Sequence, residues 1–111
     1  KTNRRLMMES LLTGSRVYGT PTDESDIDVV CLMSHDEFHA LLAMADNPDC
    51  ETRPASGKAS QSLRFGKLNL ICVTPNEYDK FTAWKDGTAH LKSIAPVTRE
   101  AAVEHFKSRG V

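Results

Sequence analysis

Long apolar runs are absent from this sequence of 111 residues. No run approaches the roughly 18 residues that a membrane-spanning helix needs. The sequence also shows no leader in which a charged segment is followed by an apolar one. An excess of charge of one sign is absent as well, because the formal net charge is -1. The chain as a whole therefore has no general attraction to nucleic acid or to an anionic membrane. We expect neither a membrane span nor a membrane partner.

Cysteine is scarce too. The three cysteines, Cys31, Cys50 and Cys72, are an odd number and form no Cys-x-x-Cys pair. This usage favours a reducing, cytoplasmic location over a disulfide framework. Cys31 and Cys72 lie inside apolar runs, which lack the polar surroundings that activate a thiol. We expect both to be buried thiols without a redox or metal function.

What the sequence does contain is typical of one ordinary domain, with 40% hydrophobic and 26% charged residues and no internal repeat. Short runs rich in β-branched residues predict strands over residues 8–13 and 26–33. Two more strands are predicted within residues 62–74, around a turn at Gly66 and Lys67. The order of elements predicts an α+β fold, a mixed β-sheet of about four strands with helices packed on one face. We expect one domain over residues 1–111.

Helix starts are marked by capping patterns. Ser34 is followed three residues later by Glu37, and Thr74 is followed at the same distance by Glu77. The second pattern also has Pro75 at its first position, where a missing N–H group does no harm. We therefore expect helices to begin at both places, each with a reciprocal capping box.

Thr98 is the expected cap of a last helix, which ends near Gly110. Apolar side chains recur at helical spacing in the three helices. The expected inward residues are Phe38, Leu41, Leu42 and Ala45 in the first helix, Tyr78, Phe81, Trp84, Thr88 and Leu91 in the second, and Ala102, Val103 and Phe106 in the third. Gly87 costs the second helix about 1 kcal/mol relative to alanine, so we expect a break or bend there. Residues 45–62 are expected to form a long loop.

Two aspartates, Asp26 and Asp28, open the second predicted strand in the sequence SDIDVVCLM. Because side chains alternate along a strand, both carboxylates lie on one face and Ile27 and Val29 lie on the other. If helices cover the Ile27 face, the acids emerge on the open face. Two acids so close together repel each other unless a cation lies between them, and Mg²⁺ suits such oxygen ligands. Taken alone, the pair also fits two solvated acids at the start of a strand.

Gly14 and Ser15 follow the first predicted strand directly, in the sequence LLTGSRVYGT. Glycine lets a backbone approach a ligand closely, and a serine at a helix start can offer its N–H and hydroxyl groups to a phosphate. Neighbouring strands lie about 4.8 Å apart, so a triphosphate could extend from this corner to the acids on the next strand. Such an arrangement is what nucleotidyl transfer requires.

The segment from Gly14 to Asp28 resembles the signature of the polymerase-β-like nucleotidyltransferase superfamily, in which Gly-Ser and a spacer precede Asp-x-Asp. The short spacer, with GSRVYGT and SDIDV on its two sides, looks like the minimal nucleotidyltransferases of bacteria and phages. The later stretch KLNLICVT, with Phe81 and Trp84 beyond it, is similar to small phage-encoded proteins of this type.

The resemblance implies a role for each matching residue. Gly14 and Ser15 would hold the triphosphate of a nucleoside triphosphate, with ATP the expected one. Asp26 and Asp28 would be the catalytic acids that coordinate Mg²⁺ or Mn²⁺. Arg16 and Tyr18 could touch phosphates or ribose, although a solvated arginine and a tyrosine packed on the sheet are equally compatible with the sequence. The reaction implied is transfer of an NMP group to a hydroxyl of a protein, an RNA or a small molecule.

One departure from the superfamily pattern concerns Asn69, which stands where a third carboxylate is expected. An amide can coordinate through its oxygen, but it carries no charge and accepts no proton. Three interpretations stay open: a slow or specialised transferase, a substitute acid at Glu77 or Asp79, or nucleotide binding without catalysis. The last would be a regulatory module of the kind that minimal nucleotidyltransferases form with toxin partners. A protein partner or a homodimer is also compatible with so small a chain.

Other polar residues give weaker signals. His35, His39, His90 and His105 are scattered, and although the first two share a helix face, no acid motif makes them a zinc site. A second group of cations flanks the expected open face and could meet an acceptor's phosphates, or simply form a solvated rim. These cations are Arg53, Lys58, Arg64 and Lys67.

Overall fold

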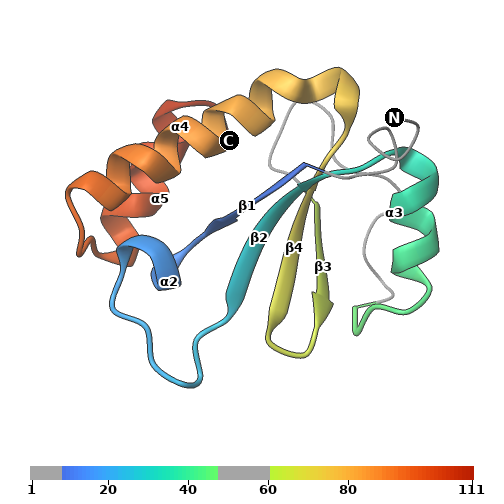
Figure 1. Cartoon of the computed structure of the whole chain (residues 1–111), viewed down its shortest axis with the longest axis horizontal. Coiled ribbons are helices and arrows are strands. Elements are labelled where there is room, and N and C mark those ends of the chain that lie inside the picture. Colours follow the sequence, from blue (N-terminus) through green and yellow to red (C-terminus); the bar gives the residue numbers. More distant parts are fainter. Residues whose placement is uncertain (1–8, 48–60) are drawn as a thin grey trace.

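The computed structural model describes residues 9–47 and 61–111, and Figure 1 shows the order of elements along them. The strands are β1 (Ser10–Thr13), β2 (Ile27–Leu32), β3 (Gln61–Phe65) and β4 (Leu68–Val73). The helices are α2 (Ser15–Tyr18), α3 (His35–Leu42), the 3₁₀ turn η1 (Pro75–Glu77), α4 (Tyr78–Ser93) and α5 (Arg99–Ser108). The strands agree with the predicted ones to within a few residues. The long loop predicted over residues 45–62 lies mostly outside the described residues, as do Arg53, Lys58 and Cys50.

The four strands form one mixed sheet in the order β1-β2-β4-β3. β1 pairs with β2 in the antiparallel direction, β2 pairs with β4 in parallel, and β3 pairs with β4 in the antiparallel direction. The tight turn between β3 and β4 places Gly66 at a φ of 64°, a conformation that glycine adopts without steric cost. The α+β fold with a mixed four-stranded sheet is therefore confirmed.

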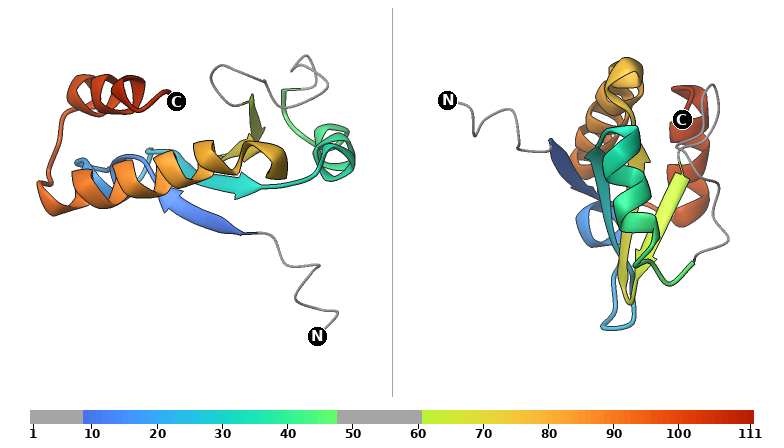
Figure 2. Two further views of the ribbon diagram at one scale, coloured as in Figure 1. Left: turned by 90° about the horizontal axis from the view of Figure 1, so that it is seen from above. Right: turned by 90° about the vertical axis from the view of Figure 1, so that its right-hand side faces the viewer.

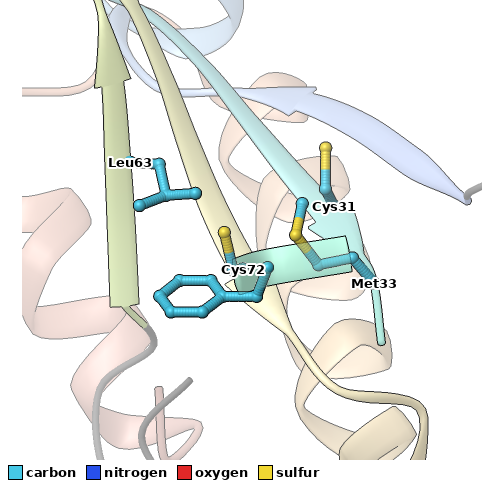
Figure 3. Packing of buried hydrophobic residues seen from close by; sticks show 5 residues of the cluster. Cys31, Met33, Leu63 and Cys72 are labelled. Carbon is cyan, nitrogen blue, oxygen red and sulfur yellow. The ribbon is translucent and has the colours of Figure 1, made fainter. Parts of the chain in front are cut away.

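One face of the sheet packs against α3. Its centre is the buried cluster formed by Cys31, Met33, Phe38, Leu63 and Cys72. Figure 3 shows how the side chains of Cys31, Met33, Leu63 and Cys72 gather from β2, β3 and β4 at this cluster. Both cysteines are buried thiols, as the sequence predicts. Burial raises the pKa of the Cys31 thiol, which keeps it protonated and unreactive near neutral pH.

The opposite face packs against α4 over part of its area. Val30, Val73 and Phe81 are buried there, with Trp84 at the edge of the cluster. Helices therefore cover both faces of the sheet, in contrast to the expected single covered face. The reason lies in β2, where Val29 and Cys31 face α3 while Val30 and Leu32 face α4, so that this strand is apolar on both sides. Figures 1 and 2 show α3 apart from α4 and α5, which lie together.

Two of the three predicted helix caps are confirmed. Ser34 and Glu37 form the reciprocal capping box of α3, and the Thr98 hydroxyl accepts the N–H of Ala101 at the start of α5. The predicted box at Thr74 is wrong. The N–H of Glu77 donates instead to the Thr74 carbonyl at 2.9 Å, which closes the 3₁₀ turn η1 and delays the α-helix to Tyr78.

Gly87 does not interrupt α4, which runs unbroken over Tyr78–Ser93. Its role is to let α5 approach. A Cβ atom at this position would lie 2.6 Å from Cε1 of Phe106, closer than real carbon atoms come. Phe106 and Ala102 are buried against α4 as expected, whereas Val103 is 49% exposed and not inward. One step along a helix turns a side chain by about 100°, so Val103 points away from the interface with α4 in which its neighbour Ala102 is buried.

Candidate functional site

The topology of the sheet brings the two predicted motifs to one end. β2 and β4 are parallel and begin at that end, whereas β1 is antiparallel to β2 and finishes there. Thr13 therefore pairs with Asp28, and Asp28 pairs with Asn69 on its other side. Arg64 joins the same row, because β3 pairs Arg64 with Asn69. Four neighbouring strands thus each contribute a polar residue to one line across the sheet.

Gly14 is the point at which β1 turns into the short helix α2. Its φ of 81° and ψ of -169° belong to a region that side chains with a Cβ atom rarely adopt. A Cβ atom there would also lie 2.2 Å from Oδ2 of Asp28. The glycine is therefore required twice, once by the turn and once by the carboxylate that lies against it. The Gly-Ser corner and the second acid are in direct contact.

Thr13 and Tyr18 fix this corner from beneath. The buried Thr13 hydroxyl bonds to the Thr88 hydroxyl at 2.7 Å, which ties the end of β1 to α4. Tyr18 is 8% exposed and packs with Leu91 and Phe106. Burial is the main cause that raises the pKa of Tyr18; hydrogen bonds with Thr13 and Gly14 oppose the rise, and the charge of Asp28 adds to it. The tyrosine is held as a neutral phenol next to the acid.

The corner is also joined to the segment that leads into α5. The Tyr18 carbonyl accepts the N–H of Val97 at 2.7 Å. Since α5 begins at Arg99, this backbone bond fixes the start of the last helix beside the Gly-Ser corner.

Asp26 and Asp28 each receive a donor from the β3–β4 side of the sheet. The Arg64 guanidinium donates to Oδ1 of Asp26 at 3.0 Å. The Asn69 amide donates to Oδ1 of Asp28 at 3.1 Å. The remaining amide oxygen of Asn69 is buried and has no hydrogen-bond partner among the described residues. Both acids are half-buried, on the same face of β2.

The loop between α2 and β2 sets the position of Asp26. The Arg16 guanidinium donates to the carbonyls of Thr22 at 3.2 Å and Ser25 at 2.9 Å. From the other side, the Lys67 ammonium donates to the Asp23 carbonyl. Arg16 therefore braces the loop and does not line the cleft described next, whereas Gly14, Ser15 and Tyr18 do.

An open cleft of about 980 Å³ lies above this row of polar residues. One side is polar, with Gly14, Ser15, Asp26, Asp28 and Arg64. The other side is largely apolar and belongs to α5 and α4. The lining residues there are Trp84, Val97, Ala102, Val103 and Phe106, with Arg99 and Lys107 beside them. The cleft therefore has a charged end, formed by the polar residues of the sheet, and an apolar end, formed by the residues of α4, α5 and the segment between them.

The charged end suits one hard cation. Carboxylate oxygens are ligands that Mg²⁺ prefers, and the site offers those of Asp26 and Asp28, whereas Asn69 faces Asp28 with its amide nitrogen. In the described ranges, no group of three or more His, Cys, Asp or Glu residues lies close enough to hold a metal ion. Glu24 also lines the cleft but does not complete such a group.

Glu77 and Asp79 do not replace the expected third acid. Asn69 lies at the start of β4, whereas Glu77 and Asp79 follow its far end, beyond Val73. Neither of them lines the cleft. The interpretation that one of these acids substitutes for the third carboxylate is therefore wrong.

The model of the nucleotidyltransferase domain family matches residues 7–64, more than half of the chain. The chain belongs to this family. The matched segment includes the Gly-Ser corner, the acids and Arg64. The segment ends before Asn69 and before the helices that form the apolar side of the cleft. Comparisons with curated proteins and with solved structures find no match for the chain.

Sequence reasoning on this nucleotidyltransferase domain missed two features of the site. It did not find the Thr13–Thr88 bond, whose partners lie 75 positions apart. It also missed the pairing of Arg64 with Asp26, although the predicted β3–β4 hairpin was a signal that Arg64 and Asn69 lie side by side. The alternation along β3, with Leu63 buried beneath, then places Arg64 on the side of the acids.

No helix of the described residues is long and apolar enough to span a membrane.

Proposed function

We propose that this nucleotidyltransferase domain binds a nucleoside triphosphate together with Mg²⁺ and transfers its NMP group to a hydroxyl acceptor. The observation that carries the proposal is the contact between the Gly-Ser corner and Asp28, since a Cβ on Gly14 would overlap that carboxylate. A phosphate held at the corner then lies within reach of a cation held by the acids. This proximity is what a metal-dependent transfer needs.

Each residue of the charged end has a place in this proposal. Gly14 leaves the backbone open to the phosphates, and the Ser15 hydroxyl can donate to them. Asp26 and Asp28 supply the charged oxygens that would hold Mg²⁺ or Mn²⁺, and the Asn69 amide holds the Asp28 carboxylate in place through its N–H group. A cation bound there would offset the charge of the triphosphate and of the departing pyrophosphate.

The transfer itself is a displacement at the α-phosphorus. A new bond forms between the acceptor oxygen and the α-phosphorus while the bond to the β-phosphate oxygen breaks. Pyrophosphate leaves with that electron pair, and the proton of the acceptor hydroxyl passes to water through the open side of the cleft. Tyr18 stays protonated throughout, because burial raises its pKa. Its part is to hold the corner in place.

The apolar end of the cleft supports a nucleoside as the ligand. Trp84, Val103 and Phe106 provide apolar surface at the end opposite to the acids, where a base can be buried. Arg99 and Lys107, beside it, can meet the phosphates of an acceptor. ATP is the nucleotide that we propose to test first, and the acceptor can be a protein, an RNA or a small molecule.

Calorimetry of the full chain with ATP, with and without Mg²⁺, tests the proposal. We expect binding that requires the metal and that falls by about hundredfold or more in the variant Asp26→Asn, Asp28→Asn, because the charged ligands are lost. Asp36→Asn on α3 is the matched control, since it makes the same chemical change on an exposed residue away from the cleft. Equal ATP affinity in the double variant and the wild type would refute the site.

A second candidate function rests on the donors that face the acids. Asn69 stands where a third carboxylate is expected, and Arg64 adds a positive charge beside Asp26, which favours a regulatory module that binds nucleotide without catalysis. Incubation with α-labelled ATP and candidate acceptors separates the two functions. Transfer of label supports the enzyme, whereas Mg²⁺-dependent binding without any transfer supports the regulatory module.

A further inference from the structure

Arg64 adds a positive charge to a site that is otherwise built around two acids. Its guanidinium lies 3.0 Å from Oδ1 of Asp26, and it reaches that acid from β3, across the strand that carries Asn69. The charged end therefore contains two carboxylates and one permanent cation, because arginine stays protonated at any ordinary pH. These three groups carry a net charge of -1, and Glu24 of the preceding loop adds one negative charge to the lining of the cleft.

The two acids alone offer few anionic ligands for a pair of divalent cations. The site lacks a third carboxylate, since Asn69 is neutral, and the guanidinium repels a cation that approaches Asp26 from its side. Among the residues that the structure describes, no cluster of three potential metal ligands is present to compensate. The residues in place can hold one ion between Asp26 and Asp28, with the guanidinium as the second positive group.

The Arg64–Asp26 pair is also exchangeable. The two side chains are 42% and 41% exposed, and pairs with that much contact with water contribute little to stability. When a metal ion neutralises Asp26, the guanidinium is free to turn toward a ligand in the cleft that it already lines. Its planar group of N–H donors matches the oxygens of a phosphate in a bidentate manner.

We propose that Arg64 takes the place of a second metal ion: the domain binds one divalent cation, and Arg64 moves from Asp26 to the phosphates of the bound nucleotide. This inference rests on the proposed function, because it assumes that a nucleotide and a metal share the cleft. It predicts opposite effects of one substitution. Loss of Arg64 should raise the affinity for the metal in the absence of nucleotide and lower the affinity for the nucleotide.

The test uses the full chain, Mn²⁺ as the metal and the non-hydrolysable analogue α,β-methylene-ATP. Electron paramagnetic resonance counts free Mn²⁺ during a titration, and calorimetry measures the affinity for the analogue. We expect one bound Mn²⁺ per complex in the wild type. In Arg64→Met, we expect the analogue to bind about tenfold to hundredfold more weakly, the loss typical of a hydrogen bond to a charged group. Without nucleotide, Mn²⁺ should bind this variant more tightly than the wild type.

Three further variants sharpen the result. Lys85→Met on α4 removes one positive charge from an exposed residue outside the cleft lining, and it should leave both affinities unchanged. Arg64→Lys keeps the charge without the planar group, so its analogue affinity should lie between those of the wild type and Arg64→Met. Asn69→Asp combined with Arg64→Met restores the missing charge and should bind a second Mn²⁺ per complex. A urea denaturation curve for each variant shows that it is folded.

The outcomes separate the inference from the proposed function. Two Mn²⁺ ions in the wild-type complex, or an unchanged analogue affinity in Arg64→Met, would overturn the role of Arg64 and leave the proposed function standing. A wild-type chain that binds no analogue in the presence of Mn²⁺ would overturn both. Opposite shifts in the two affinities, with a single ion in the wild type, would support the inference.

Discussion

The two faces of the sheet are built from the same strands and differ in the residues at their less covered ends, which are apolar on the α3 face and charged on the α4 face. On the α3 face, β2, β3 and β4 contribute buried side chains that close over Phe38, which has no exposed surface. On the other face, α4 covers Val30 and Val73 and reaches Thr13 through Thr88, but it leaves the part of the row from Asp28 to Arg64 open to the cleft. The α3 face has its packed core around Phe38 and leaves Ile27, at the start of β2, 37% exposed. The other face has a core at one end and the candidate site at the other.

This difference shows how a domain of this size accommodates a site without losing its core. β2 changes character along its length, with Asp28 at its beginning and Val30 in the middle of the same face. The acids lie where α4 no longer shields the sheet, and the second wall of the cleft comes from α5. We therefore expect substitutions on the α3 face to change stability alone, and substitutions near α5 to change stability and ligand binding together.

The largest effect is expected on the α3 face. Phe38→Ala removes a fully buried aromatic side chain and should lower the free energy of unfolding by about 3–5 kcal/mol, through lost burial and the cavity left behind. Urea denaturation measures this loss. ATP affinity, measured at low temperature where the variant is still folded, should equal that of the wild type. A weaker affinity in the folded variant would mean that the two faces are not independent.

A smaller effect is expected where α4 meets α5. Gly87→Ala should lower the free energy of unfolding by about 1–2 kcal/mol, because overpacking against Phe106 outweighs the gain of about 1 kcal/mol in helix propensity. ATP affinity should fall with it, since Phe106 lines the cleft. Ala89→Gly, at an exposed position of the same helix, measures the propensity difference by itself. A stabilised Gly87→Ala variant would show that α5 does not approach α4 closely.

The smallest effects are expected from two helix caps, one for each face. Ser34→Ala and Thr98→Ala should each cost about 1 kcal/mol, because each removes an oxygen that accepts a backbone N–H. Hydrogen exchange should increase in the first turn of α3 in one variant and of α5 in the other. Only Thr98→Ala should weaken ATP binding, since Thr98 lines the cleft. The same loss of ATP affinity in both variants would contradict the comparison.

Local signals in the sequence predicted most of the fold. The β-branched runs, the Gly66 turn and the caps at Ser34 and Thr98 depend on residues a few positions apart, so each can be read from the chain directly. Thr74 fails for a local reason, because two backbone conformations compete there and the 3₁₀ turn prevails. Whether α4 lies on the face of the acids or on the opposite one depends on tertiary packing, and that part was not predictable.

The candidate site was also predictable from the sequence only in part. Gly14, Ser15, Asp26 and Asp28 belong to a compact motif, and the pairing of β1 with β2 brings them together as the motif suggests. Arg64 needed one further step, namely the register of β3 on β4. Whether Asp26 and Arg64 form an ion pair depends on side-chain conformations that no pattern in the sequence specifies. The assignment of nucleotide and metal to these residues stays a prediction.

The bond from Val97 to the Tyr18 carbonyl has a consequence for motion in the cleft. It links the two walls at their common base, so a ligand that pulls on the Gly-Ser corner also pulls on the start of α5. Phe106, in the last turn of α5, packs against α4 at Gly87, so the helix is held at both of its ends. The wall that it forms should therefore keep its place when a ligand enters.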